Sequence, residues 1–297
     1  MGKMDGKVVN TEVIVDNGPS SQRFNLVILG DGYREVELDQ YRSDAQKFVD
    51  AFLAASPFDT LRAAFNVFRI DVQSTDSGAD LPQPCFAHSV EARTFFDATF
   101  CTQGVGRLLS VDGAVVVDVA NAEVPEWRML IVLVNSTEYG GSGDDGGGIA
   151  CFSLAPGADD IALHEMGHAA FGLADEYGFY AECGKNEGRN RYKGKEPSAP
   201  NVTSASTLDA IKWKNLIPAG TAVPTSRNPD CADCDPNPSP VPHGTVGAFE
   251  GAAYYHCGLY RPEFDCRMRT ISRPFCSVCQ EVIRRRLKPF LPAGSPG

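Results

Sequence analysis

The stretch Leu163–Gly178, LHEMGHAAFGLADEYG, contains two of the five histidines of the chain, four residues apart. Residues at this spacing lie one turn apart on the same face of a helix, so His164 and His168 can direct both imidazoles at one metal ion. Glu165, beside the first histidine, is placed to act on a water molecule rather than as a ligand. This is the H-E-x-x-H pattern, whose histidines bind zinc. The stretch therefore predicts a helix that carries a Zn²⁺ site.

The alternative interpretation is a helix in which two histidines occur by chance. The neighbouring residues Leu163, Met166, Gly167 and Ala169 are small or apolar and suit a buried helix. Burying two imidazoles and a carboxylate without partners costs free energy, and a bound metal ion removes that cost. The sequence thus favours zinc binding, which for catalysis needs a third protein ligand and one position open to water.

The third ligand is sought among the acids that follow the histidines. Asp175 lies seven residues beyond His168, which on a continuous helix places it about 10 Å further along the axis, too far to share a metal ion. Gly172 can adopt a left-handed conformation and end the helix, so that the chain folds back. We predict Asp175 as the third ligand, with Glu176 and then Tyr177 as the remaining alternatives.

Composition limits the classes of function. The 297 residues are 43% hydrophobic, which is enough for one large domain or two small ones. A net charge of -11 repels phosphate groups and argues against nucleic-acid and anionic-membrane partners. No apolar run approaches the ~18 residues of a membrane span, and the first residues contain no apolar segment typical of a secretory signal.

Ten cysteines are present, and seven of them follow the histidine pair. An even number in a Pro- and Gly-rich half favours a disulfide framework in an oxidising compartment, so an extracellular location is favoured although no signal peptide is visible. Two CxxC pairs, Cys231–Cys234 and Cys276–Cys279, are also compatible with a structural zinc ion. Free thiols are the third alternative, and the spacing leaves all three open.

Hydrophobic periodicity predicts alternating strands and helices in the first half. Apolar runs predict strands at 23–30, 65–72, 113–121, 128–135 and 149–154. The amphipathic segment 35–55 predicts a helix, so the strands that flank it should be parallel. Asp159 or Asp160 is placed to cap the helix that carries the histidines. Residues 179–247 predict a loop-dominated region, and a short helix from Cys276 should end before Pro289.

The order of residues around the histidines is similar to that of the metzincin peptidases, HExxHxxGxxH or HExxHxxGxxD. It departs by one residue and reads HExxHxxxGLxDEY. In this form it resembles peptidase family M64, which is named for an immunoglobulin A peptidase. The likeness extends over nearly the whole chain through the segments FNLVILGDGY, IVLVNSTEYGGSG, GAFEGAAYYHCGLYRPEFDCRMR and FCSVC.

The resemblance implies a fold as well as a site. It implies an α/β (α+β) metzincin-like zinc peptidase with a twisted mixed sheet, an active-site helix and an edge strand that pairs with extended substrate. Residues 146–154, GGGIACFSL, are our candidate for that edge strand. The resemblance also implies a methionine-containing turn beneath the metal ion, at Met268 in DCRMR.

Other polar residues are weaker candidates. His256 is an alternative metal ligand, although a lone histidine beside a cysteine is more often structural. Tyr254, Tyr255 and Tyr260 are candidates for stabilising an oxyanion. Two acids line the site or hold turns, and the sequence does not separate these roles: Glu250 in FEGA and Asp31 in GDGY.

These observations lead to one expected function and two alternatives. We expect a zinc-dependent endopeptidase in which Glu165 is the base and a protein or peptide is the substrate. We expect one catalytic domain over 1–297, with subdomains at about 20–174 and, rich in cysteine, about 175–290. The alternatives are a non-catalytic peptide- or protein-binding module on a zinc-peptidase scaffold, and a zinc hydrolase of cell-wall amide bonds. The oligomeric state stays open.

Overall fold

The structure is a computed structural model that describes residues 5–143, 147–179, 190–235 and 237–294. Contacts within the chain divide it into two compact units. Unit 1 comprises Met1–Ala170 and Arg286–Gly297, and unit 2 comprises Phe171–Arg285. That the two units are subdomains of a single catalytic domain stays a prediction.

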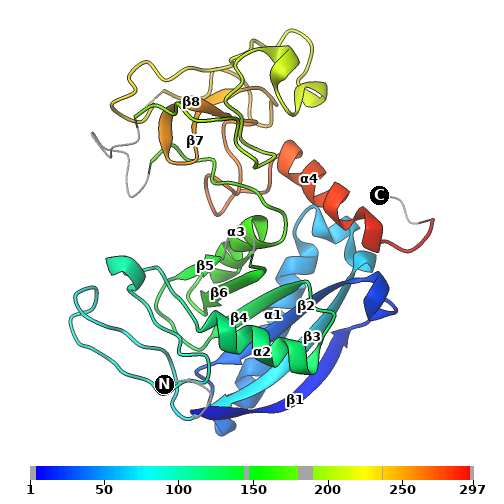
Figure 1. Cartoon of the computed structure of the whole chain (residues 1–297), viewed down its shortest axis with the longest axis vertical. Coiled ribbons are helices and arrows are strands. Elements are labelled where there is room, and N and C mark those ends of the chain that lie inside the picture. Colours follow the sequence, from blue (N-terminus) through cyan, green and yellow to red (C-terminus); the bar gives the residue numbers. More distant parts are fainter. Residues whose placement is uncertain (1–4, 144–146, 180–189, 236, 295–297) are drawn as a thin grey trace. The chain divides into compact units, whose positions relative to one another are not determined.

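Unit 1 is built on a six-stranded mixed sheet with the order β1-β3-β2-β4-β6-β5 (Figure 1). Its strands are β1 (Gly6–Val15), β2 (Phe24–Asp31), β3 (Phe65–Ser74), β4 (Met129–Val134), β5 (Gly141–Gly143) and β6 (Ile149–Ser153). β2, β3, β4 and β6 are parallel, whereas β1 and β5 run antiparallel at the two edges. The predicted α/β class with a mixed sheet is therefore confirmed, and so is the parallel pairing of β2 with β3.

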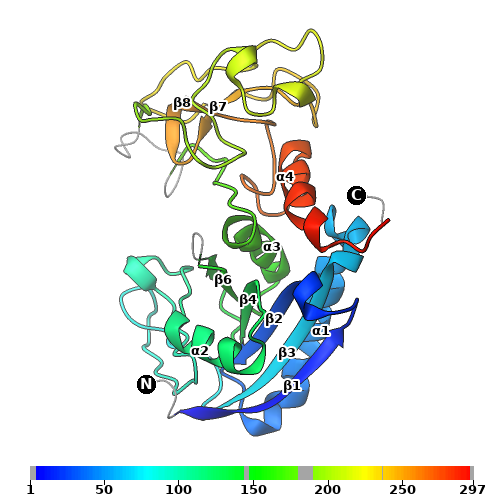
Figure 2. The ribbon, with the colours of Figure 1, turned by 45° about the vertical axis from the view of Figure 1, so that its right-hand side comes forward.

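Three helices accompany this sheet: α1 (Leu38–Ala54), α2 (Gly113–Glu123) and α3 (Ala158–Ala169). The views in Figures 1 and 2 place α1 and α2 on opposite sides of the sheet. Alternate residues of β2 face the two sides, since Val27 and Leu29 pack in one cluster with Val116 of α2. On the other side the Tyr41 hydroxyl of α1 donates to the carbonyl of Ile28, at 2.9 Å.

The strand expected at 113–121 is wrong, because these residues form α2. The Asp112 carboxylate accepts hydrogen bonds from the amides of Ala114 and Val115, at 3.0 and 3.1 Å, and so caps the helix. Val116, Val119 and Ala120 are its buried residues. Their spacing of three and four is helical, and this packing outweighs the weak strand preference of a valine run.

Asp31 has a structural role at the end of β2. Its fully buried carboxylate accepts hydrogen bonds from the amides of Phe96 and Ala98, at 2.9 and 3.1 Å, and from the Ser74 hydroxyl. These contacts fix the long segment between β3 and α2. Burial nevertheless raises the pKa of Asp31.

The expected edge strand at 146–154 is also wrong. β6 is an inner strand that pairs with β4 on one side and with β5 on the other. The outermost strand is β5, whose sequence is GSG. β5 and β6 are antiparallel neighbours. The apolar pattern of β6 did not indicate that a further strand pairs with it.

Unit 2 has little regular structure in its described residues. A two-stranded antiparallel sheet comprises β7 (Phe249–Ala252) and β8 (Tyr255–Arg261), and α4 (Ser277–Leu287) begins in this unit. The described parts of 179–247 contain only the short 3-10 turns Leu208–Ala210 and Lys214–Leu216, in accordance with the predicted loop-dominated region. None of the described helices is long and apolar enough to cross a membrane.

Disulfides form in both units. Cys85 pairs with Cys101, and Cys231 pairs with Cys257. Cys234 is also disulfide-bonded. A zinc site built from the two CxxC pairs is therefore wrong, because Cys231 and Cys234 are both consumed by disulfides.

Gly32 provides a test of the turn that follows β2. Its φ is +72°, and an added Cβ would lie 1.9 Å from the carbonyl oxygen of Gly78. Gly104 has a similar φ of +77° with open space around it, so Gly104→Ala is a matched control. We expect Gly32→Ala to lower the free energy of unfolding by at least about 2 kcal/mol more than Gly104→Ala, because only Gly32 adds overlap to backbone strain. Denaturant titration measures the difference, and equal losses would contradict it.

Candidate functional site

The two histidines of α3 converge. Their Nε2 atoms lie 3.1 Å apart, with ring centroids at 4.8 Å and ring planes at 86°. Two nitrogens on one tetrahedral zinc ion, each at its usual bond length, lie about 3.3 Å apart. His164 is buried and His168 is half-buried. The distance between the two nitrogens therefore fits one shared metal ion.

The first turn of α3 differs from the predicted cap. The capping residue is Gly157, with φ +80°, and it has no side chain to cap the helix. Asp159 and Asp160 lie within the first turn instead, where negative charge interacts favourably with the helix dipole. Leu163 and Met166 are buried, so they anchor the helix that presents the histidines.

Glu165 lies beside the edge strand of the sheet. A Cβ atom added to Gly143 of β5 would lie 2.7 Å from Glu165 Oε2 and 3.2 Å from Glu165 Cβ. Only a glycine therefore fits next to this carboxylate without displacing it. The histidine motif alone did not identify Gly143 as a neighbour of Glu165. The available signal was the glycine-rich sequence GGSG at 140–143, which precedes the motif and ends with Gly143.

The helix ends where the sequence requires. α3 stops at Ala169, and Gly172 adopts a left-handed φ of +65°. The continuous helix that would carry Asp175 far along the axis is therefore absent from this part of the chain. The acidic segment that follows belongs to unit 2.

Asp175 is buried and is held by the hairpin between β7 and β8. The Tyr254 hydroxyl donates to Asp175 Oδ2. The amide of Ala253 donates to the Asp175 carbonyl and that of Tyr254 to the Tyr177 carbonyl, both at 3.0 Å. The tip of this hairpin thus fixes the Asp175 backbone and one carboxylate oxygen.

That hairpin tip is strained. Ala253 and Tyr254 have φ values of +47° and +67°, as the two central residues of a tight hairpin turn require. Glycine and asparagine are the usual residues there, and other residues cost roughly 1–2 kcal/mol each. Strain of this kind concentrates at functional sites. The sequence offered Tyr254, Tyr255 and Tyr260 as candidates for stabilising an oxyanion. Of these three, Tyr254 donates a hydrogen bond to Asp175.

The Glu176 side chain has different hydrogen-bond partners from the side chain of Asp175. Its Oε1 accepts hydrogen bonds from Asn201 Nδ2 at 2.9 Å and from the Cys279 thiol at 3.2 Å. Burial raises the pKa of Glu176 well above its ordinary value. Its amide donates to the carbonyl of Met268 at 2.7 Å, and the Met268 side chain is fully buried. Asp175 and Glu176 therefore enter separate environments.

The other predicted residues of unit 2 lie in structural positions. Glu250 accepts the amides of Asn228 and Gly258, at 3.0 and 2.8 Å, and so holds two turns. His256 is buried, with Nδ1 3.1 Å from the Cys231 carbonyl oxygen. Two of the weaker candidates join ring or strand contacts: Tyr255 packs against Tyr192, and Tyr260 pairs with Thr203. Tyr177 stacks on Phe179, and its hydroxyl hydrogen-bonds with Tyr254 and Asp175.

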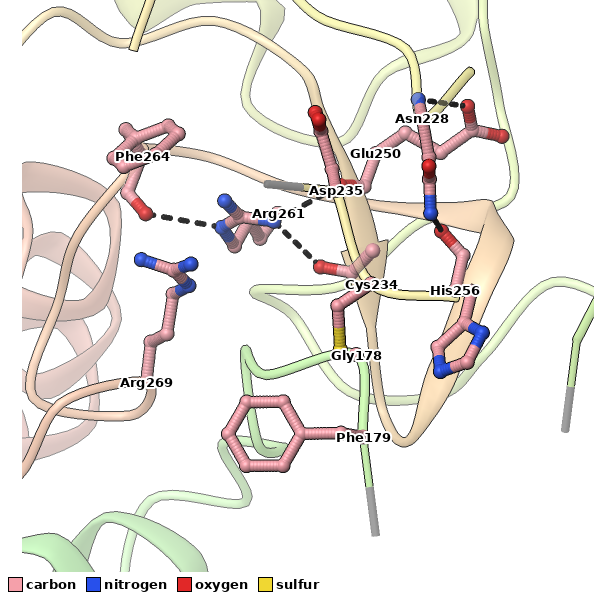
Figure 3. Close-up of a pocket in the computed structure, with 11 residues that line it drawn as sticks. Gly178, Phe179, Asn228, Cys234, Asp235, Glu250, His256, Arg261, Phe264 and Arg269 are labelled. Atoms are coloured by element: carbon pink, nitrogen blue, oxygen red, sulfur yellow. Dashed lines mark hydrogen bonds between the residues drawn. The ribbon is translucent and has the colours of Figure 1, made fainter. Parts of the chain in front are cut away.

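A small cavity in unit 2 lies between His256 and Arg261 (Figure 3). Its volume of about 40 Å³ accommodates ordered water rather than a peptide side chain. The Arg261 guanidinium donates to the carbonyls of Glu250, Gly251 and Phe264, at 2.7–3.1 Å. Burial lowers the pKa of Arg261 to about 9. This cavity is part of the packing of the hairpin and is too small to hold a substrate.

The family model described as IgA Peptidase M64 matches residues 13–233 and 239–287. The match includes α3, the acidic segment after Gly172 and both strands of unit 2. No curated protein matches the chain.

Proposed function

The chain belongs to the IgA peptidase M64 family, and from this membership we propose that it is a zinc-dependent endopeptidase that cleaves peptide bonds within protein substrates. Membership by itself supports a hydrolase of peptide bonds. The observation that carries the finer proposal is the 3.1 Å approach of His164 Nε2 and His168 Nε2, together with a glutamate beside the edge of the sheet.

We propose His164, His168 and Asp175 as the zinc ligands. The two imidazoles fit a shared ion by their distance. Asp175 is proposed as the third ligand because the helix ends before it and because Glu176 is engaged with Cys279. The Tyr254 hydroxyl positions the Asp175 carboxylate by donating to Oδ2.

Each side chain then has a defined task. A zinc ion held here supplies a Lewis acid, which polarises a peptide carbonyl and makes water a competent nucleophile near neutral pH. Glu165 accepts a proton from that water and passes it to the leaving amine. The Glu165 carboxylate is half-buried beside β5, so its proton transfers occur next to the edge of the sheet.

The edge strand β5 is proposed to bind the substrate backbone. Its inner side pairs with β6, as in Gly141 opposite Phe152. At Gly141 its outer side is bridged to Leu108, and the Gly141 amide donates to the Arg107 carbonyl at 3.2 Å, so we propose that an extended peptide pairs beyond Gly141. A peptide added there would run past Gly143 and therefore past Glu165. In addition, the Met268 side chain is buried, and the Met268 carbonyl accepts a hydrogen bond from the Glu176 amide. Together these features support a metzincin-like architecture.

The two alternative functions are less well supported. A binding module with a purely structural zinc ion has no use for a glutamate fitted against the sheet edge. A cell-wall amide hydrolase uses the same chemistry, but the proposed strand pairing suits an extended polypeptide better.

Glu165→Gln tests the role of the proposed base. We expect kcat/KM on a denatured protein substrate to fall about 10²–10⁴-fold, because the amide accepts no proton. The zinc content, measured by mass spectrometry of the metal, should be unchanged because Glu165 is not a ligand. Asp159→Asn, at an exposed position of the same helix, is the matched control and should retain activity. Full activity of Glu165→Gln would sink the mechanism.

Gly143→Ala tests the contact between β5 and Glu165. The added Cβ displaces the carboxylate, so we expect kcat to fall by about 10-fold or more while zinc is retained. Gly106→Ala is the control, since its Cβ would meet only Cys85 Cβ, at an ordinary 3.6 Å. Equal kcat values for the two variants would show that β5 does not constrain Glu165.

A further inference from the structure

Four buried side chains of unit 2 meet away from the proposed catalytic residues. They are Glu176, Cys266, Cys276 and Cys279, and their ligand atoms all lie within 4.8 Å of one another. We propose that they bind a second zinc ion, which has a structural role. The proposal does not rest on the peptidase function, since none of the four is assigned a task in peptide hydrolysis.

The distances suit a metal ion and not a disulfide. Cys266 Sγ and Cys279 Sγ lie 3.8 Å apart. Two sulfurs on one tetrahedral zinc ion, each at its usual bond length, lie about 3.8 Å apart, whereas a disulfide bond measures about 2.05 Å. Glu176 Oε1 lies 3.2 Å from Cys279 Sγ, against about 3.6 Å for an oxygen and a sulfur on the same ion.

The surroundings orient these groups as ligands. The amide of Cys276 donates to Cys266 Sγ at 3.2 Å, and that of Cys279 donates to Cys276 Sγ at 3.5 Å. Cys276 directly precedes α4 and Cys279 lies in its first turn, where the helix dipole stabilises thiolates. Hydrogen bonds of this kind fix ligand geometry at metal sites.

The carboxylate of Glu176 supplies the independent argument for an ion. Asn201 Nδ2 binds Oε1, whereas the buried Oε2 has no hydrogen-bond partner among the described residues. A carboxylate buried among three sulfurs is costly without a cation. A zinc ion bound by this carboxylate and the three sulfurs removes this cost.

The ligand set favours zinc and a closed site. Three thiolates with one oxygen in tetrahedral arrangement suit zinc better than calcium or magnesium, which prefer oxygen ligands. Four protein ligands leave no position for substrate, which is the mark of a structural site. The ion would join the acidic segment, the Cys266 turn and the start of α4 in a unit with little regular structure.

The remaining described free thiol provides a control. Cys151 lies in β6, and burial raises the pKa of its thiol to about 12. It donates to the Leu109 carbonyl at 3.3 Å and belongs to no ligand cluster of the described residues. Cys151→Ser therefore removes a buried thiol without touching the proposed site.

The test begins with a chain that lacks the catalytic histidines. In His164→Ala/His168→Ala, purified without added metal, we expect one zinc per chain by mass spectrometry of the metal. Adding Cys276→Ser should abolish this zinc, and adding Cys151→Ser should not. Loss of peptidase activity in the histidine variant leaves this count unaffected, so the two proposals fail separately.

The unaltered chain provides a second measurement in case Cys276→Ser does not fold. Replacing its metal with Co²⁺ should produce the intense thiolate-to-cobalt charge-transfer absorption that histidine and carboxylate ligands do not give. Absence of this absorption would overturn the proposal. So would iron in place of zinc, a histidine variant without metal, or a disulfide between any two of the three cysteines.

Discussion

The end of α3 and the left-handed conformation of Gly172 are the constraint on which the rest of the site depends. α3 can offer only two ligands, because a third on the same helix would lie a further turn away. The left-handed φ of +65° at Gly172 ends the helical path and begins the segment of Asp175 and Glu176. These two acids are neighbours in sequence with different partners: Tyr254 donates to Asp175, and Cys279 donates to Glu176. One short segment thus connects both proposed metal sites.

This arrangement makes unit 2 more than a loop-rich appendage. The hairpin of β7 and β8 is strained at its tip and holds Asp175. The cysteine cluster holds Glu176, the next residue in the sequence. Both contacts limit the freedom of the same segment. In unit 1, the edge strand β5 constrains Glu165 in a comparable way, because the glycine at 143 leaves room for the carboxylate and for nothing larger. The residues of the proposed reaction are therefore fixed by neighbours that carry no chemistry themselves.

Local patterns predicted the local features. The helix over 35–55, the parallel strands around it and the end of α3 near Gly172 follow from periodicity and from glycine conformation. The error at α2 has a local cause, the Asp112 cap, and a non-local one, the burial of one helix face. The error at β6 is non-local, because β5 returns beside it. The CxxC pair at 276 combines with Cys266 and with Glu176, 100 residues before it. No spacing rule connects such distant residues, since only the fold brings them together.

Anomalous diffraction at the zinc absorption edge, from crystals grown without added metal, tests the central claim most directly. The claim is that Asp175 and Glu176 serve two different zinc ions. It predicts two peaks, one bounded by His164, His168 and Asp175, and one bounded by Glu176 and the three cysteines. A single peak with Glu176 beside the histidines, or a cysteine cluster without density for an ion, would contradict it.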